Sequence, residues 1–242
     1  MAGTTRNLLI VEGQGDIHFL DHILRSRGFS RSVQAGSGRF IVARPESPES
    51  TAVRIIGADG FKGIPEALKR EFRADDLAGL AIVADMDLLE DNRWESLRGT
   101  LAGYGFDSLT KVLPKEGLVA RQEQNPALGV WMMPDNENAG MLETFACRLV
   151  AGEDPAWLHA TAAVASLPEG AGRFSRERHL EKALIHTWLA WQEEPGCQLG
   201  TAVAKKYLRT DHDDVGRFCS WIERWLAASE GAGFRVGRDG AF

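Results

Sequence analysis

Short apolar runs alternate with amphipathic segments over the first 150 residues of the chain. Four short, mostly apolar runs are typical of strands buried on both faces: 8–11, 53–56, 80–83 and 130–133. Apolar residues recur at helical spacing in 15–28, 64–72, 94–102 and about 139–149. A strand at 40–43 and an edge pair at 109–113 and 117–121 complete the expected elements. This alternation predicts an α/β fold with a mainly parallel sheet flanked by helices.

From about residue 153 the pattern is helical, with two apolar stripes. The stripes consist of Leu180, Ala183, Leu184, Trp188 and Trp191, and of Phe218, Trp221, Ile222, Trp225 and Leu226. We expect residues 151–242 to form a C-terminal helical extension that packs through these aromatic stripes on an α/β domain of residues 1–150. The two parts form either separate domains or one continuous domain. We also expect a solvated loop at 45–50, a polar turn at 210–214 that caps the last helix, and fraying of the Gly-rich tail after residue 228.

Composition narrows the class of protein. The formal net charge of −6 weighs against a large nonspecific nucleic-acid surface, because Lys and Arg drive phosphate binding. The three cysteines (Cys147, Cys197 and Cys219) lack CxxC spacing, so we expect reduced thiols rather than disulfides or a zinc site. No run reaches the roughly 20 apolar residues of a membrane span, and the polar start is too short for a signal peptide. We therefore expect a cytoplasmic protein without a membrane partner.

Acidic residues follow the apolar runs. They are Glu12 after the first run, Asp59 after the second, Asp85 and Asp87 after the third, and Asp135 after the last. The carboxyl ends of parallel strands meet at one edge of a sheet, where ligands bind. In extended backbone, the two-residue spacing of Asp85 and Asp87 places both carboxylates on one face, where they repel unless a cation is shared. Mg²⁺ prefers such oxygen ligands, although each acid alone is also a common turn former or helix cap.

Residues 11–16 (VEGQGD) resemble the first motif of Toprim domains, the catalytic module shared by topoisomerases, bacterial primases and the OLD (overcoming lysogenisation defect) nucleases. Residues 82–87 (IVADMD) resemble the Toprim DxD motif. Residues 57–65 and 134–143 are similar to the Gly-rich second turn and the late acidic motif of the OLD-like branch. The resemblance covers about residues 6–150 and implies a Toprim, Rossmann-like domain that hydrolyses phosphodiester bonds in DNA or RNA.

The resemblance also implies roles for individual residues. Glu12 would be a general acid/base or metal ligand, and Asp85 and Asp87 would hold Mg²⁺ or Mn²⁺. A second ion would be held with Asp16 and Glu143, and two cations about 4 Å apart can activate water and stabilise the leaving oxygen. OLD-like nucleases use a late lysine, for which Lys182 and Lys205 are the candidates. The other late basic residues, which are also typical of a solvated helix face, are Arg173, Arg176, Arg178, Lys206 and Arg209.

The leading hypothesis is therefore a metal-dependent nuclease, for which the OLD-like resemblance implies defence against phage or mobile elements. Since the chain has no GxxxxGKS/T phosphate loop, a nucleotide-driven motor is absent or supplied by an ATPase partner. The alternative is a noncatalytic or regulatory Mg²⁺-binding Toprim module that acts with such a partner. A third hypothesis is a flavodoxin-like response module with Mg²⁺ beside a phosphorylatable Asp, but the lysine and hydroxyl expected after its later strands are not evident.

Overall fold

The computed structural model describes residues 7–31, 40–43, 52–72, 77–122, 125–168 and 170–230. The loop expected at 45–50 and the tail beyond residue 230 lie outside these residues. None of the helices in the described part of the chain has the length and apolarity needed to cross a membrane.

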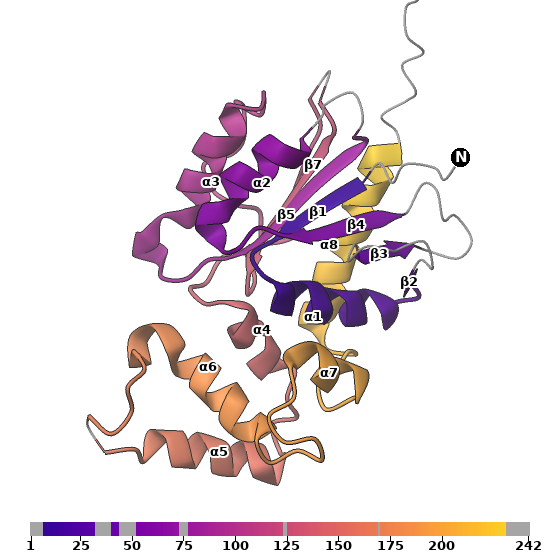
Figure 1. Cartoon of the computed structure of the whole chain (residues 1–242). Helices are drawn as coiled ribbons and strands as arrows, with labels where there is room; N and C mark the ends of the chain where they lie inside the picture. The colour runs from indigo at the N-terminus through magenta and orange to yellow at the C-terminus, as the bar shows by residue number, and fades with distance from the viewer. Residues whose placement is uncertain are drawn as a thin grey trace, which may run out of the picture.

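Within the described residues, one seven-stranded sheet forms the centre of the molecule (Figure 1). Its strands are β1 (Asn7–Val11), β2 (Ser30–Arg31), β3 (Phe40–Ala43), β4 (Val53–Gly57), β5 (Gly79–Asp85), β6 (Leu118–Ala120) and β7 (Ala127–Met133). They lie in the order β2-β3-β4-β1-β5-β7-β6. Strands β4, β1, β5 and β7 are parallel, while β2, β3 and β6 form antiparallel pairs towards the two edges. The α/β fold with a mainly parallel, Rossmann-like sheet is confirmed.

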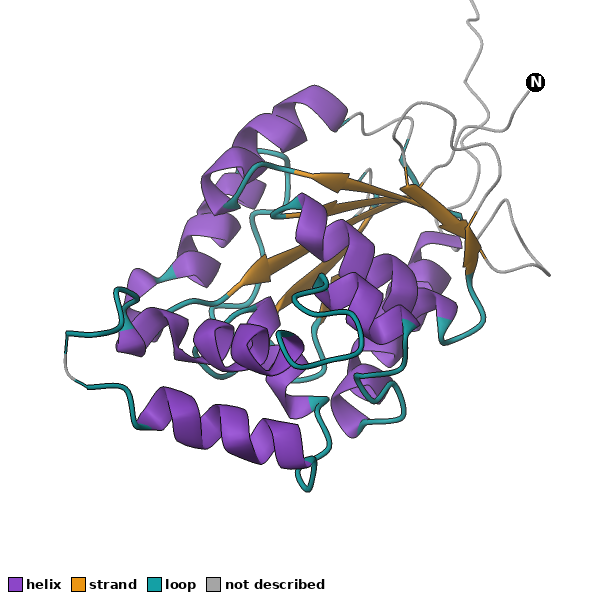
Figure 2. Ribbon diagram, turned by 60° about the horizontal axis from the view of Figure 1, so that its bottom comes forward, coloured by secondary structure: helices purple, strands orange, loops and turns teal. Residues whose placement is uncertain are grey.

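Helices cover both faces of this sheet (Figure 2). They are α1 (Gln14–Arg25), α2 (Ile64–Glu71), α3 (Arg93–Ala102), α4 (Leu142–Arg148), α5 (Pro155–Ala165), α6 (Arg176–Leu189), α7 (Leu199–Ala204) and α8 (Asp213–Glu230), with short 3-10 turns η1 (Phe61–Gly63) and η2 (Leu89–Asp91). Successive strand residues point to opposite faces, so Leu8 and Ile10 pack with α2 and α3, while Leu9 and Val11 pack with α1, α4 and α8. This burial on both faces explains why the strands read as continuous apolar runs.

Three elements differ from the sequence prediction. Residues 109–113 form bends and irregular structure rather than a strand. Leu109 and Leu113 are buried against the α2 and α3 layer, so the apolar pattern of this segment reflects the packing of a loop. Helix α1 begins at Gln14, because extended Gly13 is its N-cap and its N–H donates to Asp16 Oδ2 at 2.6 Å. Helix α4 begins only at Leu142, after Gly140, whose φ of 139° a side chain rarely adopts.

The C-terminal helices do not separate from the α/β layer at residue 150. Helix α8, yellow in Figure 1, packs on the sheet, where Trp221 Nε1 donates to the carbonyl of Leu118 at 2.9 Å and Trp225 Nε1 to that of Ala127 at 3.0 Å. One apolar core contains residues of β1, β5, β7 and α8 together. The predicted packing of this aromatic stripe on the sheet is confirmed, and among the described residues α8 shares one core with the face of the sheet that it covers.

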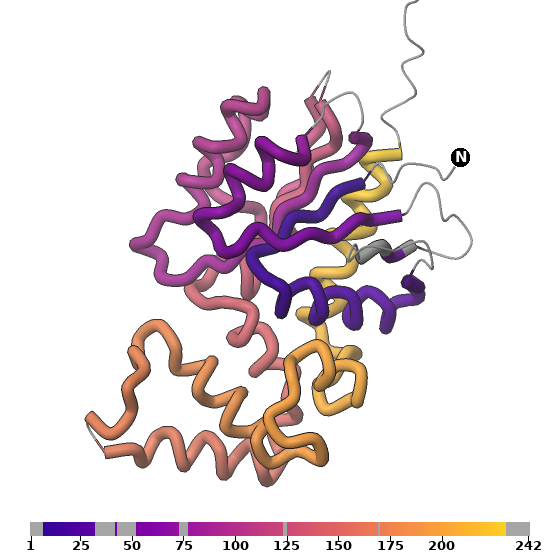
Figure 3. The backbone as a smooth tube through the Cα atoms, in the orientation of Figure 1, coloured from indigo at the N-terminus to yellow at the C-terminus, as the bar shows by residue number. Residues whose placement is uncertain are grey.

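Helices α5 and α6 form a hairpin that projects away from the sheet at the bottom of Figure 3. Helix α6 buries Ile185, Trp188 and Leu189. The predicted stripe is wrong for Trp191, which is 46% exposed beside His159. The reason is that α6 ends at Leu189, so helical spacing no longer predicts which way a later side chain points.

Candidate functional site

The first acid and the aspartate pair lie together because β1 and β5 are neighbouring parallel strands. Glu12 follows β1, Asp85 ends β5, and Glu12 Oε1 accepts the N–H of Asp85 at 2.8 Å. The backbone of Asp87 is left-handed, with a φ of 53°, rather than extended. The prediction that extended backbone places Asp85 and Asp87 on one face therefore does not hold. Its N–H and carbonyl form a two-way bridge with Gly140 at 2.8 Å each, which joins the loop after β5 to the loop before α4.

Arg93, the first residue of α3, lies between these acids and was not among the sequence candidates. Its Nη1 donates to Glu12 Oε1 at 2.9 Å and to the carbonyl of Asp85 at 3.3 Å, and its Nη2 pairs with Asp87 Oδ2. The guanidinium also lies over the ring of Phe61, with Cζ 4.7 Å from the ring centroid. No local sequence motif identifies this residue, because its position depends on how the segment from β5 through η2 turns back and places the start of α3 beside the strand ends.

A small pocket opens beside the acids. It is lined by Glu12, Asp16, Leu20, Val83, Ala84, Asp85, Met133 and Leu142. The apolar members come from strand ends, α1 and α4, and they remove water from the carboxyl groups and raise the free energy of their charged forms. The pocket therefore combines charge with desolvation, which is a common property of functional sites.

Burial and mutual repulsion raise the pKa values of three carboxyl groups in this pocket. Burial, followed by the charges of Glu12, Asp16 and Glu143, raises the pKa of Asp85 well above 3.8, against the lowering effect of the Leu142 N–H at 2.9 Å. Burial raises the pKa of Asp16 to about 6, although the Gly13 N–H opposes this shift. Burial also raises the pKa of Glu12, against the Asp85 N–H and the Arg93 charge. These acids carry more negative charge than their surroundings neutralise.

Of the two late lysines, the structure brings Lys182 to the acids and leaves Lys205 elsewhere. Lys182 Nζ, on α6, lies 2.8 Å from Oε1 of the buried Glu143 on α4. One turn earlier on α6, Arg178 forms a two-pronged ion pair with Asp91 of η2 at 2.8 and 3.2 Å. Lys205 instead pairs with Glu194 at 3.1 Å. Helix α6, from the C-terminal part of the chain, therefore contributes cations at the rim of the site.

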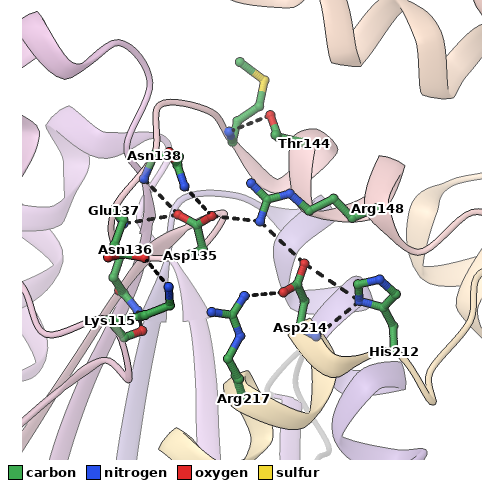
Figure 4. A network of polar contacts seen from close by, with 11 residues as sticks. Lys115, Asp135, Asn136, Glu137, Asn138, Thr144, Arg148, His212, Asp214 and Arg217 are labelled. Carbon is green, nitrogen blue, oxygen red and sulfur yellow. Dashed lines mark hydrogen bonds and ion pairs between the residues drawn. The ribbon is translucent and has the colours of Figure 1, made fainter.

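Two of the strand-terminal acids lie outside the cluster. Asp59 is exposed in a left-handed conformation with a φ of 58°. Asp135 belongs to a separate network, shown in Figure 4, where its Oδ2 lies 2.8 Å from Arg148 Nη1 and its oxygens accept the Asn138 N–H and Nδ2. Arg148 also reaches Asp214 at the start of α8, at 3.5 Å. The expectation that Asp135 joins the other acids is wrong, because Arg148 of α4 brings a competing cation to it.

The same network contains the turn expected to cap the last helix. The Asp214 N–H donates to His212 Nδ1 at 3.2 Å, and Arg217, one turn later, pairs with the Asp214 carboxylate (Figure 4). Residues 210–214 thus form a polar turn at the start of α8, as predicted. The network as a whole fastens the end of β7 to α4 and α8.

Asp135→Asn is expected to destabilise the protein by about 2 kcal/mol at pH 7. Burial would raise the pKa of Asp135, but hydrogen bonds from Asn138, from Arg148 and from the Glu137 N–H lower it to about 2. A lowered pKa means that the stabilisation is complete above pH 3.8 and is lost as the pH falls towards 2. Urea unfolding of both proteins from pH 7 to pH 2 measures this difference. A gap that stays constant over this range would contradict the assignment.

The donor set suits a divalent cation in its chemistry, since Glu12, Asp16, Asp85 and Glu143 all offer carboxylate oxygens, and the charges of Glu12 and Glu143 raise the pKa values of Asp16 and Asp85. Arg93 forms ion pairs with Glu12 and Asp87, and Lys182 forms one with Glu143. In the described part of the chain no three Asp, Glu, His or Cys side chains stand together in a metal-binding arrangement. An ion that used Glu12, Asp87 or Glu143 would have to displace the arginine or lysine paired with it.

Comparison with known proteins gives one match. A family model described as "Protein of unknown function (DUF3226)" matches residues 6–227. No curated protein and no solved structure matches the chain.

Proposed function

The chain belongs to the DUF3226 family of proteins of unknown function, and we propose that it is a metal-dependent nuclease or related phosphodiesterase acting on DNA or RNA. The observation that carries this proposal is the pocket at the ends of β1 and β5, where burial raises the pKa values of Glu12, Asp16 and Asp85 together. Buried carboxylates that repel one another are costly unless a cation neutralises them. Their location after parallel strands is the usual location of an α/β active site.

The proposed ligands are Glu12, Asp16, Asp85, Asp87 and Glu143, which would hold one or two Mg²⁺ or Mn²⁺ ions. A bound divalent ion supplies an activated water and neutralises charge on a phosphoryl oxygen. Glu12, which lines the pocket, would act as the general acid/base towards a water there or as a ligand of the ion. Lys182, at the rim, is placed to offset charge on the scissile phosphate once it leaves Glu143.

The Toprim assignment belongs to this proposal, since it is supported by the motif order together with the strand order. Glu12 follows β1, and β1 is the neighbour of β5, which carries Asp85. The motif resemblance implies this arrangement. An ATPase partner and a defence role follow from the same resemblance and are proposed with it, and a cytoplasmic location is proposed from the composition of the chain. The described cysteines are free thiols, which agrees with a reducing compartment.

A noncatalytic or regulatory Mg²⁺-binding module that acts with an ATPase partner is the second candidate. The observation that favours it is Arg93, which neutralises Glu12 and Asp87 in the metal-free chain and so offers a stable resting state without hydrolysis. Binding of Mg²⁺ without cleavage of any nucleic acid, together with co-purification of an ATPase, would favour this candidate over the nuclease.

The nuclease proposal predicts Mg²⁺- or Mn²⁺-dependent cleavage that Glu12→Gln lowers by about a hundredfold or more. Glutamine keeps the carbonyl that accepts the Asp85 N–H, but it loses the negative charge and the basic oxygen. Plasmid, linear duplex, single-stranded DNA and RNA are each incubated with the protein and either ion, and products are resolved on gels. The matched control is Glu95→Gln, which removes an exposed carboxylate paired with Arg98 on α3 and should change the rate less than twofold. Cleavage that is equal in the Glu12 variant and the parent protein would contradict the proposal.

A further inference from the structure

The Arg93 side chain lies between two carboxylates of the site. Its two terminal nitrogens contact carboxylates of different segments, Glu12 after β1 and Asp87 after β5. Such charge-assisted contacts are about twice as strong as neutral hydrogen bonds. A guanidinium shared by two carboxylates offsets their repulsion as a divalent ion would, although it brings one positive charge rather than two. The Arg93 side chain therefore supplies the cation of the metal-free site.

The surroundings of the guanidinium allow it to leave. The Arg93 side chain retains 19% of its exposed area, and Glu12 and Asp87 retain 16% and 21%, so the group lies at the mouth of the pocket rather than inside it. Its other contacts are the Asp85 carbonyl at 3.3 Å and the face of Phe61. Since the side chain extends from the first turn of α3, rotation about its own bonds can move the charge into solvent without moving the helix.

We propose that Arg93 is an internal competitor of the divalent ion: its guanidinium neutralises Glu12 and Asp87 in the metal-free protein and must leave them before an ion can bind. This inference rests on the proposed function, because it concerns the same carboxylates. It assigns to Arg93 the role of setting the ion concentration at which the site fills. A cation and a guanidinium that use the same oxygens exclude each other, so the affinity for the ion is lowered by the strength of the contacts that it breaks.

The test is Mn²⁺ binding by isothermal titration calorimetry to the full chain and to its Arg93→Gln variant. Glutamine is similar in length and remains polar, but it carries no charge to compete. The dissociation constant for Mn²⁺ should fall about tenfold in the variant, since charge-assisted contacts no longer have to be broken. The control is Arg98→Gln, five residues later on α3, where the arginine pairs with the exposed Glu95 and should change the constant less than twofold.

A second variant covers the case in which Arg93→Gln does not fold. Phe61→Leu keeps every charge but removes the aromatic face under the guanidinium, and it should tighten Mn²⁺ binding about threefold. Equal or weaker Mn²⁺ binding by the folded variants would overturn the inference and leave the proposed function standing. Absence of Mn²⁺ binding by the parent protein and by both variants would instead reject the proposed function itself.

Discussion

Asp85→Asn is expected to lower divalent-ion-dependent cleavage by about a thousandfold while making the metal-free protein more stable by about 1 to 3 kcal/mol. Loss of activity follows because Asp85 is the central carboxylate of the pocket, facing the charges of Glu12, Asp16 and Glu143. Asparagine keeps an oxygen for the Leu142 N–H, so the local backbone contact at 2.9 Å survives. The gain in stability follows because a buried, repelled charge is removed.

The pH dependence of this gain has a defined sign. The pKa of Asp85 is raised well above 3.8 in the folded protein, so the ionised group destabilises the fold at neutral pH and ceases to do so as the pH falls towards 3.8. The stability difference between Asp85→Asn and the parent protein should therefore be largest near pH 7 and shrink on acidification. Urea unfolding in the presence of a chelator measures it.

The matched control for this prediction is Asp107→Asn, which changes an exposed aspartate in the turns after α3. It should leave cleavage unchanged within about twofold and shift stability by less than about 0.5 kcal/mol. If Asp85→Asn were to keep its activity, or to unfold more easily than the parent protein without metal, Asp85 would be a structural acid rather than the centre of a cation site.

Trp221→Ala is expected to destabilise the protein by about 4 kcal/mol, the largest effect on stability that we predict for a single residue. The indole is fully buried, its Nε1 donates to the carbonyl of Leu118 at 2.9 Å, and its ring contacts Trp131 and Phe218. Truncation leaves a cavity between α8 and the sheet and an unpaired carbonyl on the edge strand β6. The midpoint of urea unfolding, followed by far-UV circular dichroism, measures the loss.

Trp191→Ala provides the comparison, because it removes the same side chain from a site that is 46% exposed. Its effect should lie within about 0.5 kcal/mol of zero. Similar losses for the two tryptophans would show that α8 is not an integral layer of the α/β fold. A large loss for Trp221 alone would support a core shared by α8 and one face of the sheet, in which the C-terminal helix completes the cover of β5, β6 and β7.

The local pattern of apolar and polar residues was sufficient to locate most of the sheet. The apolar runs located β1, β4, β5 and β7, because strands buried on both faces require apolar residues at nearly every position; β4, with Arg54, is the least buried of the four. The position of Glu12 and Asp85 directly after two of these runs was sufficient to predict that they meet. The same pattern wrongly predicted a strand at 109–113, where buried leucines belong to a loop. It also wrongly predicted burial of Trp191, because α6 ends at Leu189.

The amino-acid sequence by itself determined the α/β class, the four parallel strands and the meeting of Glu12 with Asp85, since these depend on short-range periodicity and on the shared edge of parallel strands. Only the tertiary structure decided that Arg93 bridges Glu12 and Asp87, that Lys182 rather than Lys205 reaches the acids, and that Asp135 is drawn away by Arg148. Each of these contacts depends on where a separate helix packs. Such packing is set by the summed burial of whole apolar faces, which no local motif encodes.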